Sequence, residues 1–260
     1  MKSLDLNAIE MGDNWNKLIA IIDETFTGER HEKITKLHEH FKDRMIMAPA
    51  SGTKYYHNAF PGGYVAHVLN VIDWGKKYYN LWKDGGLFTE DISEENIVFC
   101  CMFHDLGKIG NMSEDYYVVN TDDWQVKKYG RAFNHNPELH YMTVTDRAFH
   151  LLGKFHIDMS EKEFLGIKMA DGLYEKGNEN YFIEGFEWKT IKTNIGFIIH
   201  YADSTATRLE KEAYLFSGQS KIDYNKIMKG ESLEPDAEVL EGLDVDKLGD
   251  LFKWDKTFLL

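Results

Sequence analysis

A histidine and an aspartate stand side by side at the end of the longest purely apolar run in the sequence. Residues 97–103, "IVFCCMF", lead directly into His104 and Asp105. His67 lies on an apolar helical stripe, and Asp203 follows the apolar stretch "IGFII" within two turns. Burying an unpaired charged carboxylate costs on the order of several kcal/mol, and a shared cation removes that cost. Mixed imidazole and carboxylate ligation suits Mn, Fe, Zn, Co or Ni. The four residues are therefore candidate ligands of one metal site.

Each candidate also has an ordinary structural explanation. A lone histidine on an apolar helix face, such as His67, is usually a core residue hydrogen-bonded to backbone. A lone aspartate near a helix end, such as Asp203, is usually a cap or an ion-pair partner. The adjacent cysteines Cys100 and Cys101 fit reduced core thiols of a cytoplasmic protein better than a disulfide framework. Only the ordered set of four favours a metal.

The elements that must position these residues are mostly helices, so an all-α fold is expected. Ser93 and the two glutamates after it predict a helix start, and this helix is expected to end near Gly107. Ser160 and Glu163 form a predicted capping box. Further helices are predicted over 14–24, 30–46, 61–82, 161–175, 193–215 and 244–252.

One segment departs from the helical pattern. In "DYYVVNTDDWQVKKYG", residues 115–130, β-branched and aromatic residues flank "NTDD", which predicts a small β-hairpin. The sequence has no internal repeat, low-complexity tract or evident boundary. A single domain over 1–260 is therefore expected.

Charge and hydropathy restrict the partners. A formal net charge of −13 disfavours binding to extended nucleic acid, because an acidic surface repels the phosphate backbone. A small anionic substrate at a metal centre remains compatible, since the local field decides there. The apolar run at 97–103 is far shorter than the roughly 20 residues of a membrane span, and no secretory signal is visible. We expect a cytoplasmic protein without a membrane partner; a homo-oligomer stays open.

The order His, His-Asp, Asp on separate helices resembles the HD-domain superfamily of metal-dependent phosphohydrolases. "YYHNAFPGGYVAHVLNV" at 55–71 is similar to the segment that carries the first histidine in these proteins. "FHDLGKIG" resembles their His-Asp motif, and "IIHYADSTATRLE" resembles the helix with the last aspartate. "SEKEFLGIKMADGLYE" is similar to a helix and turn between them. The resemblance covers roughly residues 55–210, leaving helical extensions at both ends, and is closest in style to members encoded by bacteriophages.

This resemblance implies roles for individual residues. His67, His104, Asp105 and Asp203 would be the metal ligands, and Asp105 would also bond the attacking water. Lys108 would lie near a bound phosphate; its alternative is a helix C-terminal cation stabilised by the dipole. The other implied contacts are His57 toward substrate or a metal-bound water (otherwise a loop histidine), and Arg131, Arg147 and Arg208 as further cations, with surface ion pairing favoured for Arg208.

One departure bears on the number of metals. Dinuclear members carry extra histidines between the His-Asp pair and the last aspartate, one of them just before the glycine of a segment like "MADGLYE". This chain has Ala170 and Asp171 there. His135 and His140 fall in the intervening region without a firm alignment. We therefore expect one divalent ion (Mn, Fe, Co, Ni, Zn or Mg), with Asp171 as a substrate contact or an acid behind the ligands.

The implied activity is hydrolysis of free (deoxy)nucleotides, as a nucleotidase or a deoxynucleoside triphosphate triphosphohydrolase. A metal-activated water would attack phosphorus, and Lys108 would offset the developing negative charge. Tyr116, Tyr117 and Trp124 of the predicted hairpin are candidates to cover the pocket and stack on a base, although such aromatics more often pack on the body. The alternatives are a non-catalytic nucleotide sensor or interaction protein, and a phosphodiesterase on cyclic nucleotides or oligonucleotides.

Overall fold

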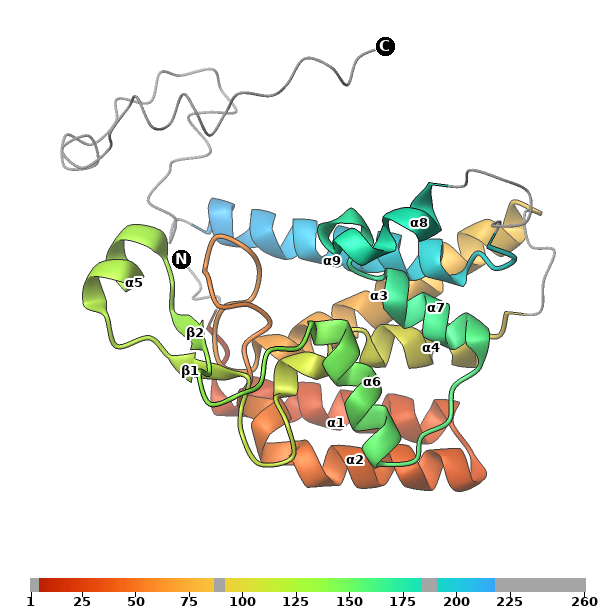
Figure 1. The fold of residues 1–260 in the computed structure, drawn as a ribbon, viewed down its shortest axis with the longest axis horizontal. Coiled ribbons are helices and arrows are strands. Elements are labelled where there is room, and N and C mark those ends of the chain that lie inside the picture. The colour runs from red at the N-terminus through yellow and green to blue at the C-terminus, as the bar shows by residue number, and fades with distance from the viewer. Residues whose placement is uncertain (1–4, 87–91, 184–190, 218–260) are drawn as a thin grey trace, which may run out of the picture. The chain divides into compact units, whose positions relative to one another are not determined.

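The computed structural model describes residues 5–86, 92–183 and 191–217. These belong to a compact unit, Met1–Gln219, and the remaining unit is Ser220–Leu260. The helix predicted at 244–252 lies outside the described residues, and a single domain over 1–260 stays a prediction. Within the described residues, helices form the body of the unit and a two-stranded sheet lies at its edge (Figure 1).

The described α-helices bear out the expected all-α class, whereas the HD-domain arrangement itself stays a prediction. Short 3-10 turns connect them: η1 (Leu106–Ile109), η2 (Gly172–Tyr174) and η3 (Lys176–Asn178). The helices are α1 (Ala8–Thr25), α2 (Gly28–Met47), α3 (Gly63–Asp84), α4 (Glu94–Phe103), α5 (Asp123–Tyr129), α6 (Val144–Lys154), α7 (Glu161–Met169), α8 (Glu179–Phe182) and α9 (Ile195–Phe216).

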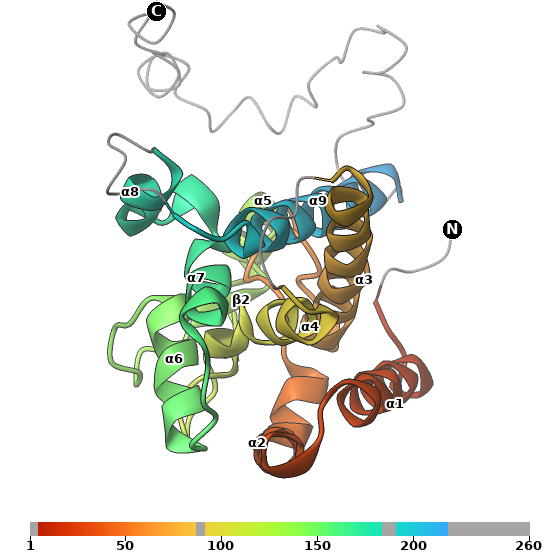
Figure 2. The same cartoon turned by 90° about the vertical axis from the view of Figure 1, so that its right-hand side faces the viewer.

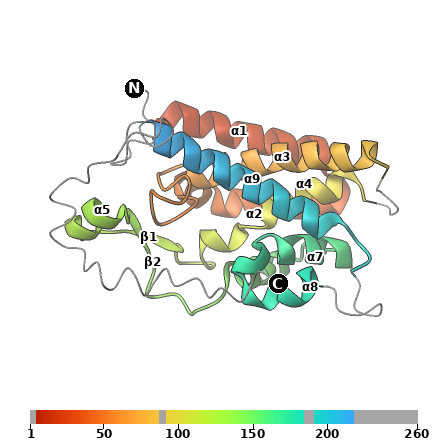
Figure 3. The same ribbon diagram turned by 90° about the horizontal axis from the view of Figure 1, so that it is seen from above.

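Three helices make up the centre of the unit. α3 packs against both α4 and α9, and α9 also packs against α7. Seen from above, α9 lies between α3 on one side and α7 on the other (Figure 3). α1 and α2 pair with each other and cover α3 from below (Figure 2). α3, α4 and α9 can therefore bring side chains to one place in the core.

α4 forms the most apolar part of this centre. All seven residues of 97–103 are buried, as expected for a helix that is apolar on every side. Ser93 caps its start and forms a capping box with Asn96. The helix ends at Phe103, earlier than the predicted Gly107, and the chain continues as η1. A Cβ at Gly107 would lie 1.9 Å from the carbonyl oxygen of Val144, so only glycine lets α6 approach here.

The other helix predictions are largely confirmed. The capping box of Ser160 and Glu163 is present at the start of α7. α7 ends at Met169 rather than near residue 175, because Gly172 turns the chain at a φ of 56°. Among the described residues, no helix combines the length and the apolar character that crossing a membrane requires.

The hairpin prediction over 115–130 is wrong in its extent. β1 (Tyr117–Val119) pairs antiparallel with β2 (Phe133–His135), which lies beyond the predicted segment. The stretch between them, predicted as turn and second strand, is helix α5. The Asp122 side chain accepts bonds from the first backbone N–H groups of α5, and Gly130 ends it in the left-handed conformation. These capping signals outweighed the β-branched and aromatic composition.

Candidate metal centre

Four polar side chains from three helices meet in the core. His67 projects from the first half of α3, and Asp203 from the middle of α9. His104 is the C-cap of α4, and Asp105 is the N-cap of η1. Both histidines and Asp105 are buried, and the side chain of Asp203 is 18% exposed. The structure therefore brings together all four predicted ligands.

The donor atoms lie close enough to share one ion. His67 Nε2 lies 3.2 Å from Asp203 Oδ1 and 3.6 Å from Asp105 Oδ2. His104 Nε2 lies 3.5 Å from Asp105 Oδ2 and 3.6 Å from Asp203 Oδ1. Ligands about 2.1 Å from one tetrahedral ion are about 3.4 Å apart. The observed separations therefore fit ligands of a common cation.

The two imidazoles also have the nitrogens that such an ion requires. Within the described residues, Nε2 of His67 and Nε2 of His104 are buried without a hydrogen-bond partner. His67 Nδ1 donates to Glu210 Oε2 at 3.0 Å, and His104 Nδ1 donates to the Cys101 carbonyl at 2.8 Å. These bonds place the proton of each neutral ring on Nδ1, leaving the Nε2 lone pair for a ligand. The residues present fit a divalent metal.

Charges in the cluster compensate one another. Burial lowers the pKa of His67, but Glu210 and Asp203 outweigh burial and raise that pKa to about 10. Burial raises the pKa of Asp203, yet the imidazoles of His104 and His67 hold it well below its usual range. Without a cation, a protonated imidazole therefore balances the carboxylates. A metal that takes both nitrogens must displace a proton.

Lys108 extends the cluster from η1. Its Nζ lies 2.5 Å from Asp105 Oδ2, the carboxylate oxygen that also faces both histidines. Burial lowers the pKa of Lys108, but the Asp105 carboxylate more than reverses this and raises it. The ammonium group is therefore charged and held beside the candidate metal site. This geometry differs from a plain helix C-terminal cation, which would point toward solvent and backbone carbonyls.

His57 lies beside the cluster on the loop before α3. Its ring centroid is 4.6 Å from that of His67. Both of its ring nitrogens are buried without a hydrogen-bond partner among the described residues. Burial, reinforced by the positive charges of His67 and Lys108, lowers the pKa of His57 to about 2. The ring is neutral at pH 7 and offers one donor and one acceptor to a ligand.

Asp171 faces the same group of charges. Thr145 Oγ1 donates to Asp171 Oδ2 at 3.4 Å. Burial raises the pKa of Asp171, the carboxylates of Asp105 and Asp203 raise it further, and Lys108 opposes them. Burial similarly raises the pKa of Tyr117 to about 12, again opposed by Lys108. Asp171 and Tyr117 therefore lie near the cluster, from η2 and β1 respectively.

The remaining candidates lie apart from it. Arg131 is exposed, and its backbone bridges to Thr53 on the loop that leads to His57. Trp124 is 58% exposed and packs edge-on against Tyr129 of the same helix. Arg147 is buried and donates to the His140 carbonyl at 2.7 Å. In the part of the chain that the structure describes, none of them forms an ion pair with Asp105 or Asp203.

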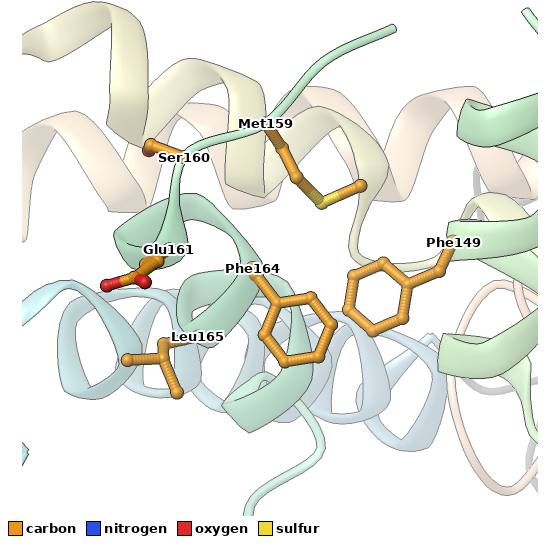
Figure 4. A pocket seen from close by; sticks show the side chains of 6 residues that line it. All are labelled: Phe149, Met159, Ser160, Glu161, Phe164 and Leu165. Carbon is orange, nitrogen blue, oxygen red and sulfur yellow. The ribbon is translucent and has the colours of Figure 1, made fainter. Parts of the chain in front are cut away.

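An open surface hollow near the start of α7 contains none of the predicted site residues (Figure 4). Its floor is mostly apolar, and the rings of Phe149 and Phe164 stack there at 4.5 Å. It lacks the convergent ionisable groups that distinguish the metal cluster, so we assign no chemistry to it.

Sequence reasoning missed Glu210, which accepts the Nδ1 proton of His67. A signal was present, because residue 210 lies seven positions after Asp203 and two helical turns return to nearly the same face. The glutamate ends the quoted stretch "IIHYADSTATRLE". Because Glu210 lies among the charged residues Arg208 and Lys211, the sequence pattern suggests a surface charge at this position.

No protein-family model, curated protein or solved structure matches this chain. Function is therefore inferred from the residues of the site and their motifs.

Proposed function

We propose that this chain is a metal-dependent phosphohydrolase that acts on free (deoxy)nucleotides, with a mononuclear site of the HD-domain kind. The observation that carries the proposal is the meeting of His67, His104, Asp105 and Asp203, with both Nε2 atoms facing the two carboxylates. The order of these residues resembles the HD motif, and their geometry is compatible with it. A cytoplasmic location is proposed with it, supported by two free buried cysteines.

Four side chains would hold the cation: the Nε2 atoms of His67 and His104, and carboxylate oxygens of Asp105 and Asp203. A divalent metal supplies Lewis-acid polarisation of a phosphoryl oxygen and a lowered pKa for water. Asp105 would also orient the nucleophilic water, because one of its carboxylate oxygens can accept a hydrogen bond from water while the other pairs with Lys108. The low exposure of the cluster restricts bulk water and strengthens each of these interactions.

Phosphate would be positioned by Lys108. Its ammonium group has three donors, and in the described part of the chain it donates to Asp105 Oδ2. The remaining donors can contact phosphoryl oxygens and offset negative charge that develops during attack. His57, on the loop before α3, would add one hydrogen bond to the substrate, since both of its ring nitrogens lack hydrogen-bond partners among the described residues.

The small size of the substrate follows from charge. The chain carries a net charge of −13, and near the site the described residues include Lys108 beside Asp105 and the buried Arg147 over the Tyr116 ring, which do not form a basic channel. A polynucleotide gains affinity from many phosphate contacts, whereas a mononucleotide needs only the metal and one or two cations. This favours a free nucleotide over an oligonucleotide.

The test is release of phosphate from a panel of nucleoside mono- and triphosphates and their deoxy forms, with Mn²⁺, Co²⁺, Zn²⁺ or Mg²⁺. We expect turnover of at least one nucleotide and loss of at least about 100-fold in the Asp105→Asn variant. Asp73→Asn is the matched control, because Asp73 lies exposed on α3 and pairs with Lys77. Metal binding without turnover of any nucleotide would contradict hydrolysis and favour a sensor.

A further inference from the structure

We infer that Glu210 is a positioning residue of the metal site: its carboxylate fixes the His67 ring so that Nε2 faces Asp203 and Asp105. The inference rests on the metal site of the proposed function. It adds a role for a residue outside the four candidate ligands, to which the motif resemblance assigns no function.

Both carboxylate oxygens of Glu210 are engaged by donors from α3. Oε2 accepts from His67 Nδ1 at 3.0 Å, and Oε1 accepts from Asn70 Nδ2 at 2.6 Å. Glu210 is only 8% exposed, so water competes little for these bonds. Two donors fix the orientation of the carboxylate, and the oriented carboxylate fixes the rotation of the imidazole ring.

Helix geometry makes this arrangement a clamp between α3 and α9. Asp203 and Glu210 are seven residues apart and so share one face of α9. His67 and Asn70 are three residues apart and are neighbours on the surface of α3. The ring of His67 therefore meets α9 twice, with Nε2 at Asp203 and Nδ1 at Glu210.

The two histidines differ in what orients them. His104 Nδ1 donates to the Cys101 carbonyl, three residues back on its own helix, and needs no help from another element. His67 depends on a charged group from a different helix. An anionic acceptor also increases the basicity of the ring and its strength as a ligand. Removing Glu210 should therefore weaken the metal site through His67.

Charge balance supports the same role. Among the groups paired with the two histidines, Asp105, Asp203 and Glu210 contribute three negative charges, and Lys108, paired with Asp105, contributes one positive charge. This leaves two negative charges when the histidines are neutral. A divalent cation neutralises this set. Without Glu210, the cluster would carry one negative charge and attract the cation less strongly.

Glu210 could instead be a ligand itself, because donor atoms of His57, His67 and Glu210 also lie within 4.8 Å of one another. The contacts argue against this, since both oxygens of Glu210 already accept N–H groups. The two roles predict opposite behaviour of Asp203. A positioning Glu210 leaves Asp203 as a ligand, whereas a ligand Glu210 would place the ion away from Asp203.

The experiment is the dissociation constant for Co²⁺, measured by chelator competition on the full chain without nucleotide. We expect Glu210→Ala to weaken binding by about 10–100-fold. Glu210→Gln should lose less, because its amide oxygen still accepts the Nδ1 proton. Asp203→Asn should lose more than either, and Glu212→Gln, an exposed glutamate on the same helix, should lose nothing. Circular dichroism of each metal-free variant checks that it folds.

The visible spectrum of bound Co²⁺ gives a second readout that a merely structural role would not explain. At saturating Co²⁺, Glu210→Gln should keep the wild-type spectrum, because the ligands are unchanged. If folded Glu210→Ala bound Co²⁺ with wild-type affinity, the inference about Glu210 would be overturned and the proposed metal site would stand. A changed Glu210→Gln spectrum with normal binding by Asp203→Asn would make Glu210 a ligand and overturn the inference too. Failure of the wild-type chain to bind Co²⁺ would overturn the proposed metal site together with the inference.

Discussion

Single residues in the core carry polar atoms that a fold without a ligand would avoid. Among the described residues, His57, His67 and His104 together have four buried ring nitrogens without a hydrogen-bond partner. A buried polar atom without any partner costs about 1–3 kcal/mol of folding free energy; the two nitrogens of His57 are such atoms, whereas the Nε2 atoms of His67 and His104 face the Asp105 and Asp203 carboxylates. These residues lie within one cluster. Their shared position is consistent with selection for binding rather than for stability.

His57 offers a direct test of whether these buried nitrogens serve ligand binding at the expense of folding stability. Replacing it with phenylalanine keeps a flat ring and removes two unpaired nitrogens, so we expect the metal-free protein to be unchanged in stability or more stable by up to about 1 kcal/mol. Turnover should fall. Urea denaturation and nucleotide assays on the same sample measure both effects. A loss of more than about 2 kcal/mol of stability would show that His57 is held by structural contacts instead.

Lys108 is expected to act on phosphate rather than on the metal. In Lys108→Met, the apolar stem of the side chain is largely kept while the charge next to Asp105 is lost. We expect kcat/KM for the preferred nucleotide to fall by about 100-fold, with one metal still bound per chain. Atomic absorption measures the bound metal and steady-state kinetics measures turnover, so together they separate an effect on phosphate from an effect on metal binding. Loss of the metal together with activity would instead assign Lys108 to the structure of the site.

Elements near the site were predictable where helix caps and apolar periodicity agree. α3, α4 and α9 carry long apolar faces, and the capping boxes at Ser93 and Ser160 fix two starts. α5 was missed because "DWQVKKY" has strand-like composition and only its caps signal a helix. The ends of α4 and α7 were predicted too late: after Phe103 the chain tightens into the 3-10 turn η1, and after Met169 it turns through Gly172 at a φ of 56°.

Gly107 lies where η1 meets the first residue of α6, and an added methyl group there should disturb the packing of these two elements. A Cβ there would lie 1.9 Å from the Val144 carbonyl oxygen, a backbone atom that cannot move aside alone. We expect Gly107→Ala to destabilise the protein by more than about 2 kcal/mol and to weaken metal binding, because Asp105 lies two residues away. Thermal denaturation and Co²⁺ titration measure these effects.

Gly153 in α6 provides the matched control. A Cβ at this position meets nothing within 4 Å. Gly153→Ala should therefore stabilise the protein by about 0.5–1 kcal/mol through higher helix propensity. If both alanine variants behaved alike, the close approach of α6 to η1 would not be what requires Gly107.

For the molecule as a whole, the sequence predicted the members of the cluster but not its distances. Periodicity places His67, His104 and Asp203 on apolar faces, and the high cost of burying them predicts a common partner. It cannot say which ring nitrogen faces which carboxylate, because that depends on how α3 and α9 cross. For this reason the bond between His67 Nδ1 and Glu210 follows only from the packing of the two helices, although the spacing of Asp203 and Glu210 places both on nearly one face of α9.

The stability of the protein at acid pH depends on His38, a buried histidine of the same core that is not part of the candidate metal site. His38 lies between the rings of Trp15 and Phe103, and burial lowers its pKa to about 4 despite the bond to the Ile34 carbonyl. The unfolded chain, with a pKa near 6.5, therefore binds the proton more readily than the fold. Stability from neutral His38 is complete above about pH 6.5 and is lost as the pH falls toward 4.

The expected loss at pH 5, relative to pH 7.5, is about 2 kcal/mol from this residue. His38→Gln cannot titrate, so the stability difference between wild type and variant should shrink by that amount over the same range. Urea unfolding at the two pH values measures it. A difference that is independent of pH would show that His38 keeps an ordinary pKa in the folded protein.

The most direct test of the metal centre is anomalous diffraction from crystals grown with Zn²⁺ or Mn²⁺. The structure predicts one strong peak in the core, about 2.0–2.3 Å from Nε2 of His67 and His104 and from oxygens of Asp105 and Asp203. Ordered side chains at these four positions with no peak between them, or a peak coordinated by other residues, would contradict the account.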